Sequence, residues 1–257
     1  MLIDTHSHLD FEDFDNDRDE VVKRAFDNGV EKIINVGCSL ERSVSSIDIS
    51  SQYDNVFASV GIHPDEAAGL KDEALLRKKI IEIAGSSDKV VALGECGLDY
   101  SHIKAEPEKK QQEALFRLHL ELAEELQLPV IVHVRDVFDE AYQVIKNYPN
   151  VSGVMHCFAG SATQAQKFIA LGFLVSFTGI VTFKNATEIH EAAREIPLGK
   201  MMVETDCPFI APEPNRGKRN EPAYVRFVGE KICELKEVNM AEVEKITTNN
   251  AQELFDI

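Results

Sequence analysis

The sequence predicts one α/β domain folded as a single (β/α)8 barrel, and two observations carry this prediction. Short apolar runs rich in β-branched residues recur eight times, and a stretch of helical periodicity follows each run. Such alternation indicates parallel strands joined by right-handed crossovers. The 257 residues also match the ~250 residues that an eight-stranded barrel needs. A doubly wound open sheet is the alternative arrangement of the same elements.

The eight expected strands are runs of four to six residues in which apolar and β-branched side chains dominate. In chain order they are Leu2–Thr5, Lys32–Gly37, Val56–Gly61, Val90–Gly94, Pro129–Val134, Gly153–Phe158, Phe173–Phe177 and Met201–Glu204.

The helices between these strands are expected where apolar residues recur at a spacing of three or four. The clearest is Pro107–Gln127, where Leu115, Leu118, Leu122 and Leu126 form one apolar stripe. The others are Glu20–Asn28, Glu41–Gln52, Leu75–Ala84, Val137–Asn147, Ala162–Leu171, Ala186–Glu195, Tyr224–Glu237 and Ala241–Phe255. The segment Cys207–Pro222, with four of the nine prolines, is expected to be a long loop over one face.

Composition narrows the class of protein. No Gly/Ser linker or low-complexity tract divides the chain, so residues 1–257 are expected to form one domain. Five widely spaced cysteines without a CxxC pair argue against a disulfide framework, and no apolar run is long enough to cross a membrane. These features predict a cytoplasmic protein. The net charge of −17 argues against broad nucleic-acid binding, so a polyanionic substrate would need a local positive site.

Histidines and carboxylates are placed where the expected strands end. His6 and His8 are separated by one residue, so on a strand both side chains point to the same face. Since the carboxyl ends of barrel strands converge on one mouth, side chains from distant strands would meet there. The residues at these ends are His6, His8, Glu95, His133, His156 and Asp206, with His63 at the end of the third strand.

Four imidazoles and two carboxylates exceed the four positions of a structural zinc site. They suit two divalent ions, about 3.5–4 Å apart, with open positions for water and substrate. Glu95 is the expected bridge, because one carboxylate can give an oxygen to each ion. His6 and His8, completed by Asp206, would hold the more buried ion, and His133 and His156 would hold the other. The metal is left open among Zn, Mn, Mg and Co.

Cys96, Cys157 and Cys207 each directly follow one of the expected ligands. Successive side chains of an extended strand alternate between faces, so these thiols are expected to point into packing, away from the metals. The alternative is a thiolate-rich zinc site.

Several motifs together resemble one known family over essentially the whole chain. They are the initial HxH, GIHP, GECGLDY, LPVIVHVRD, MHCFAG, and ETDCPFIAP followed by RGKRNEP. They resemble the TatD family of metal-dependent deoxyribonucleases, within the amidohydrolase superfamily. The resemblance implies a barrel and a divalent-metal phosphodiesterase that acts on DNA. It implies the same six metal ligands, and it implies that His63 contacts the substrate.

The expected mechanism is hydrolysis by a metal-activated water. Asp206, the principal catalytic residue together with the bridging Glu95, would orient this water and accept its proton. Glu204 shares the strand face of Asp206 and is expected to support the ligands by hydrogen bonds, or to be an ordinary barrel-interior carboxylate. Tyr100 is left open between stacking on a base and packing at the rim. The side chains expected to contact phosphate are Arg135, Arg216, Lys218 and Arg219.

Two other functions stay open on the sequence. The same site could hydrolyse a carbonyl substrate such as an amide, a lactone or an acyl ester, and the net charge favours this reading. The basic Arg216–Arg219 cluster favours the phosphodiesterase, because a neutral substrate would not need it. A non-catalytic metal-binding scaffold is the remaining alternative, although the excess of ligands argues against it. The sequence identifies no stable protein partner.

Overall fold

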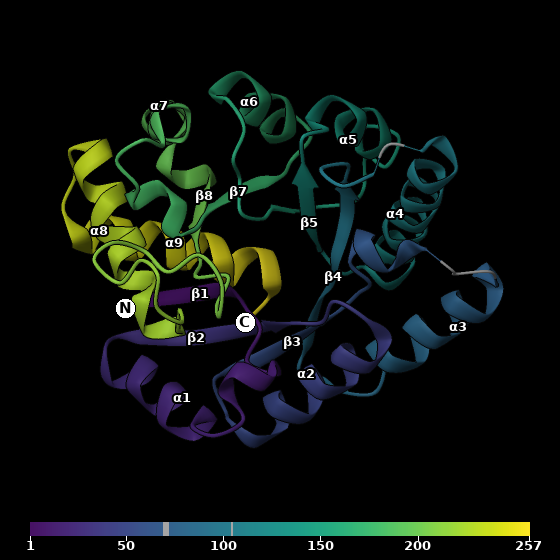
Figure 1. Cartoon of the computed structure of the whole chain (residues 1–257), viewed down its shortest axis with the longest axis horizontal. Helices are drawn as coiled ribbons and strands as arrows, with labels where there is room; N and C mark the ends of the chain where they lie inside the picture. The colour runs from purple at the N-terminus through teal and green to yellow at the C-terminus, as the bar shows by residue number, and fades with distance from the viewer. Residues whose placement is uncertain (69–71, 104) are drawn as a thin grey trace.

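The computed structural model describes residues 1–68, 72–103 and 105–257 as a parallel eight-stranded barrel surrounded by helices (Figure 1). Strand order follows the chain, from β1 to β8, and every neighbouring pair is parallel. The predicted (β/α)8 fold is therefore confirmed. The strands are β1 (Leu2–Ser7), β2 (Val30–Val36), β3 (Val56–Val60), β4 (Val90–Asp99), β5 (Val130–Arg135), β6 (Gly153–Met155), β7 (Leu174–Phe177) and β8 (Met201–Val203).

The barrel closes between its first and last strands. Ser7 and Cys207 form a parallel β-bridge. The amide of Asp206 donates to the carbonyl of His6, and the amide of His8 donates to the carbonyl of Cys207, both at 2.8 Å. Closure thus occurs just beyond β8, at the carboxyl end of β1. It brings the segment around His6 and the segment around Asp206 side by side.

An outer layer of helices covers the strands (Figure 1). The helices are α1 (Arg18–Asp27), α2 (Leu40–Gln52), α3 (Glu73–Ala84), α4 (Glu106–Leu126), α5 (Phe138–Ile145), α6 (Ala162–Ala170), α7 (Thr187–Glu195), α8 (Val225–Lys236) and α9 (Met240–Phe255). Among the described residues, no helix is both long and apolar enough for a membrane crossing.

Two hydrophobic clusters stabilise this arrangement. The larger one lies between the strands and the outer helices and includes Phe116, Phe168 and Phe173. The smaller one fills the barrel interior near the start of the strands, where Ala251 and Phe255 of α9 pack with residues such as Ile3. Because α9 packs at the amino end of the barrel, the carboxyl end is the one left available for a site.

Six strands match the sequence-based expectation to within two residues at each end, whereas β4 and β6 differ by more. β4 runs to Asp99, five residues past the expected end at Gly94, because Gly97 adopts a positive φ of 142° against β5. A Cβ atom at Gly97 would lie 1.9 Å from the carbonyl oxygen of His133, so only glycine permits this close approach. β6 instead ends three residues earlier than expected, which leaves His156 on the segment that follows it, and Asp206 lies on the segment after β8.

Candidate metal centre

The six expected ligands are gathered at the carboxyl mouth of the barrel, around a cleft of about 440 Å³. The cleft is lined by His8, Phe11, Cys38, Arg42, His63, Asp65, Glu66, Glu95, Asp99, His133, Arg135, His156, Asp206 and Phe209. His6 lies beneath its floor, with no exposed surface. Strand ends from across the sequence therefore meet at one place, as the barrel topology requires.

His6, His8 and Asp206 form an inner group that faces one oxygen of Glu95. The Nε2 atoms of His6 and His8 lie 3.2 Å apart and are 3.5 and 3.8 Å from Glu95 Oε2. Asp206 Oδ1 lies 3.7 Å from His6 Nε2 and 3.5 Å from His8 Nε2. Four donor atoms from three segments of the chain thus surround one point.

These spacings fit a divalent ion. Four ligand atoms held about 2.0–2.1 Å from one tetrahedral ion are about 3.4 Å from one another. The five measured separations in the inner group and to Glu95 run from 3.2 to 3.8 Å, close to that value. Two imidazoles and two carboxylates are also ligands that zinc and other divalent transition metals accept. The side chains of His6, His8, Glu95 and Asp206 therefore fit a divalent metal ion.

His63, His133 and His156 form an outer group that faces the other oxygen of Glu95. From Glu95 Oε1, His133 Nδ1 lies at 2.9 Å, His156 Nε2 at 3.3 Å and His63 Nε2 at 3.7 Å. The two oxygens of Glu95 thus face different nitrogen atoms, although His156 also lies close to His6 and Asp206. This is the arrangement that a carboxylate bridging two ions needs.

Hydrogen bonds on the far side of two rings fix the nitrogen that each presents. His8 Nδ1 lies 3.0 Å from the carbonyl oxygen of Val36 and must donate to it, so His8 Nε2 is left with a lone pair. His156 Nδ1 lies 2.9 Å from Glu204 Oε1, so Nε2 is the nitrogen of this ring that faces the site. Both rings are thereby held with Nε2 toward the site.

Glu204 is buried and hydrogen-bonded on both oxygens. Its Oε1 also accepts from the amide of Cys157 at 2.7 Å, and its Oε2 accepts from the hydroxyl of Thr5 at 3.3 Å. Burial opposes ionisation, but the charge and hydrogen bond of His156 lower the pKa of Glu204 below its usual value. Glu204 therefore supplies negative charge behind the ring of His156.

The pKa values of the side chains at the centre of the site are shifted in different directions. Burial opposes the charge of Glu95, but the neighbouring His63 and His156 hold its pKa well below the usual value, so Glu95 is ionised. Burial and the nearby His156 lower the pKa of His6, which keeps that ring neutral. Burial would also lower the pKa of His133, but hydrogen bonds to Asp99 and Glu95 raise it to about 9.

Two residues at the site have a left-handed backbone. Asp206 has φ 58° and Cys157, directly after His156, has φ 45°. Such conformations are costly for residues other than glycine and gather at functional sites. Asp206 is held there from beneath by Asp4, whose oxygens accept from the amide and hydroxyl of Thr205 at 2.8 and 2.6 Å. Burial raises the pKa of Asp4 to about 7.

His63 has a different hydrogen-bond pattern from the ligand histidines. Its Nδ1 accepts from the amide of Asp65 at 3.2 Å, so its proton lies on Nε2, which faces the cleft. This ring can donate a hydrogen bond to a substrate oxygen. The loop that carries it is supported by His119 of α4, whose Nε2 accepts from the amide of Ile62 at 3.2 Å. Burial lowers the pKa of His119 to about 4.

Sequence reasoning did not select Asp99, Arg42, Phe11 or Phe209, all of which line the cleft. Asp99 Oδ2 lies 3.2 Å from His133 Nε2, so this carboxylate orients an expected ligand. The signal for Asp99 was its position four residues after Glu95 on one strand face. It was missed because the strand was expected to end at Gly94.

The basic residues predicted to contact phosphate lie in different places. Arg135 lines the cleft, with its side chain 61% exposed and 3.9 Å from Asp99. Arg219 instead makes two hydrogen bonds to Asp17, of 2.7 and 2.6 Å, and Arg216 stacks over Phe183. Neither these two nor the exposed Lys218 belongs to the cleft lining, so the predicted phosphate role of all three remains a prediction.

Of the three cysteines expected to point into packing, Cys96 and Cys207 belong to the large hydrophobic cluster. Cys157 is partly buried, with its sulfur 3.5 Å from the hydroxyl of Thr178. Within the described residues, the clusters able to hold an ion contain no thiol. Tyr100 packs at the rim beneath Lys109 and does not line the cleft.

Comparison with known proteins gives one consistent result. Residues 3–256 match the family described as TatD related DNase. The chain is 43% identical to the metal-dependent hydrolase YabD of Bacillus subtilis, and the match covers 100% of both chains. It is 31% identical to the protein named 3'-5' ssDNA/RNA exonuclease TatD of Shigella flexneri, over 100% of this chain and 99% of that one.

A solved structure supports the same assignment. YJJV, a TatD homologue from Escherichia coli, superposes with a TM-score of 0.91 at 30% identity, over 100% of this chain and 98% of that chain. The motifs, the barrel and the matches over the full length agree. The chain belongs to the TatD family of metal-dependent hydrolases.

Proposed function

We propose that this protein is a two-metal phosphodiesterase that hydrolyses the phosphodiester bonds of DNA, with a water as nucleophile. The observation that carries the proposal is the position of Glu95, whose two oxygens face two different sets of imidazoles. A single structural ion would not need a second set of donors.

The residues that would hold the ions follow from these distances. His6, His8 and Asp206 would hold one ion with Glu95 Oε2, and His133 and His156 would hold the other with Glu95 Oε1. When bound, such ions lower the pKa of a water and neutralise charge on the phosphoryl oxygens. The identity of the metal among Zn, Mn, Mg and Co is a matter for experiment.

Asp206 is the proposed acceptor for the proton of the attacking water. Its side chain is 13% exposed, so one of its oxygens is within reach of the cleft. Burial opposes its charge, but hydrogen bonding to His8 and the charge of His156 lower its pKa, which keeps it ionised and able to act as a base. Glu204 would hold His156 in the productive tautomer throughout.

His63 and Arg135 are the proposed contacts of the substrate phosphate. His63 would donate from Nε2 across the cleft, and the exposed guanidinium of Arg135 would approach from its rim. Two names support a nucleic-acid substrate, because the family is described as TatD related DNase and the Shigella relative is named an ssDNA/RNA exonuclease. The five cysteines are all free, which supports our proposal that the protein acts in the cytoplasm.

One observation favours the rival reaction, hydrolysis of an uncharged carbonyl substrate. Asp65 and Glu66 line the cleft, while Arg219 is engaged with Asp17 outside it. A lactone, an amide or an acyl ester would meet less repulsion there than a polyanion. The same metal-activated water could attack carbon.

The test is a substrate panel with Asp206→Asn as the companion variant. Single-stranded DNA, duplex DNA and RNA are assayed beside a lactone and an acyl-RNA, each with Mg, Mn and Zn. We expect the wild type to cleave the nucleic acids, and we expect the variant to lose about 10²–10⁴-fold in kcat while circular dichroism stays unchanged. Turnover confined to the carbonyl substrates would establish the rival reaction, and unchanged turnover in the variant would exclude Asp206 as the base.

A further inference from the structure

Two phenylalanines stand at the cleft beside the inner group, and each follows an expected ligand by three residues. The amide of Phe11 donates to the carbonyl of His8 at 3.1 Å, and the amide of Phe209 donates to that of Asp206 at 2.9 Å. The two turns lie side by side because β1 and the segment after β8 are hydrogen-bonded to each other. The phenyl rings meet edge to face, with centroids 5.6 Å apart.

The turn that presents Phe209 is fixed from below. Asn220 is fully buried, and its side-chain amide donates to the carbonyl of Phe209 at 2.6 Å and to that of Thr205 at 2.8 Å. These two bonds tie the long loop to the segment that carries Asp206. The position of Phe209 is therefore set by the same backbone that sets an expected ligand.

Phe11 is partly buried and packs against two neighbouring side chains. The ring of His8 lies 4.8 Å from it, and the guanidinium of Arg42 lies 4.0 Å from its centroid. Arg42 is in turn paired with Asp10 at 3.1 Å. Phe11 is thus sandwiched and serves as a support for its neighbour.

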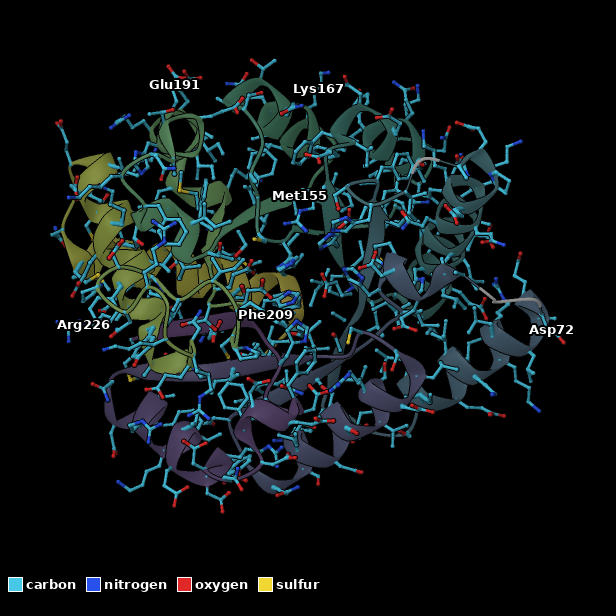
Figure 2. All side chains as sticks on the ribbon, in the orientation of Figure 1. Asp72, Met155, Lys167, Glu191, Phe209 and Arg226 are labelled. Carbon is cyan, nitrogen blue, oxygen red and sulfur yellow. The ribbon has the colours of Figure 1, made fainter. Side chains whose placement is uncertain are left out.

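Phe209, by contrast, is 48% exposed. Figure 2 shows it within the ring of helices, toward the middle of the view. The other large hydrophobic residues that are exposed in the described part of the chain are Met1, Val44 and Leu75, and none of them lines the cleft. Phe209 is therefore the one of these four side chains that lies exposed at the cleft.

We infer that Phe209 is a base-stacking surface, on which the nucleobase next to the cleaved phosphate lies flat during hydrolysis. The inference rests on the proposed function and adds to it the residue that recognises the base. Stacking on an aromatic ring needs only the π-face that every base has, so it would hold a single strand without regard to sequence. It would also supply affinity without cationic side chains, which suits a protein of net charge −17.

The experiment compares two single-stranded oligonucleotides of equal length. One carries normal bases, and the other carries abasic sites at the residues flanking the cleaved bond. For Phe209→Ala and Phe209→Leu, we expect KM for the normal strand to rise about tenfold with kcat nearly unchanged. Neither variant should change KM for the abasic strand. Phe209→Trp should keep the wild-type KM, because it restores an aromatic face.

Leu75→Ala is the matched control, since it removes an exposed apolar side chain on α3, outside the cleft. It should leave both substrates unaffected. An equal loss on the normal and abasic strands in Phe209→Ala would overturn the inference, because it would make Phe209 a support of the metal site. Equal KM values for the two strands in the wild type would also overturn it, while leaving the proposed function intact. Failure of the proposed function would be seen separately, as a wild type that cleaves neither strand.

Discussion

The inner and outer groups share Glu95 but are built differently. The inner group has its donor atoms 3.2–3.8 Å apart, with the side chains of His6 and His8 almost fully buried. In the outer group, both nitrogens of His133 are engaged by carboxylates, at 2.9 Å to Glu95 and 3.2 Å to Asp99, and the side chain is 18% exposed. One group is spaced for an ion, whereas the other is held together by its own hydrogen bonds.

The supports of the two groups also differ. Backbone hydrogen bonds and Asp4 lock the inner group between β1 and the segment after β8. The outer group depends on side chains, with Glu204 behind His156 and His119 beneath the loop of His63. An ion can therefore enter the inner group with little change in the positions of the donor atoms. In the outer group an ion must displace a hydrogen bond of His133 to Glu95 or Asp99.

The largest effect is expected where the two groups meet. Glu95→Gln removes the charge that both groups share, so kcat/KM should fall on the order of 10³-fold or more. Metal content should also drop at both positions, which elemental analysis after dialysis can measure. Retention of a full complement of metal in this variant would contradict the bridging role of Glu95.

A smaller loss is expected from Glu204→Gln, which acts on the outer group through His156. The variant keeps a hydrogen-bond acceptor for His156 Nδ1 but loses the charge, so metal affinity and activity should fall about 10–100-fold. Calorimetric titration should show weakening of the weaker binding step only. If the tighter step weakened as much, Glu204 would have to support both groups. Glu230→Gln, on the surface of α8, is the control for loss of one carboxylate.

The smallest effect concerns stability, through His119 beneath the outer group. Its pKa is 6.5 when exposed and about 4 in the fold, because burial lowers it. Between these values the unfolded chain binds more protons than the native one, so stability must fall as the pH decreases from 6.5 to 4. The loss of unfolding free energy caused by His119 approaches about 3 kcal/mol near pH 4.

Urea unfolding of the wild type and His119→Gln at several pH values isolates this contribution. The stability difference between the two proteins should shift in favour of the variant as the pH falls through that range. A difference that is independent of pH would show that His119 is not neutral in the fold.

The sequence predicted which histidines and carboxylates meet at the mouth of the barrel better than it predicted the residues that hydrogen-bond to them. His6, His8, Glu95 and His133 could be placed because strand periodicity and barrel convergence act on any residue near a strand end. Asp99 could not, because its position depends on a glycine that lets β4 continue against β5. A strand limit drawn from apolar runs alone misses such an extension.

Contacts between distant segments were beyond sequence reasoning for a different reason. Arg219 pairs with Asp17, 202 positions away, and Asp4 holds Thr205 across the closure of the barrel. Such pairs depend on how loops pack after the barrel has formed. Phe209 was missed for the same reason, because nothing in an apolar residue of a long loop indicates that it will stay exposed beside the site.

The difference between the inner and outer groups is tested most directly by a calorimetric metal titration. The wild type, His8→Ala and His133→Ala are each freed of metal and then titrated with it. We expect two binding steps of unequal affinity in the wild type. His8→Ala should lose the tighter step, while His133→Ala should keep it and lose the weaker one. If His133→Ala lost the tighter step, or if the wild type bound both ions with equal affinity, the difference between the inner and outer groups would be contradicted.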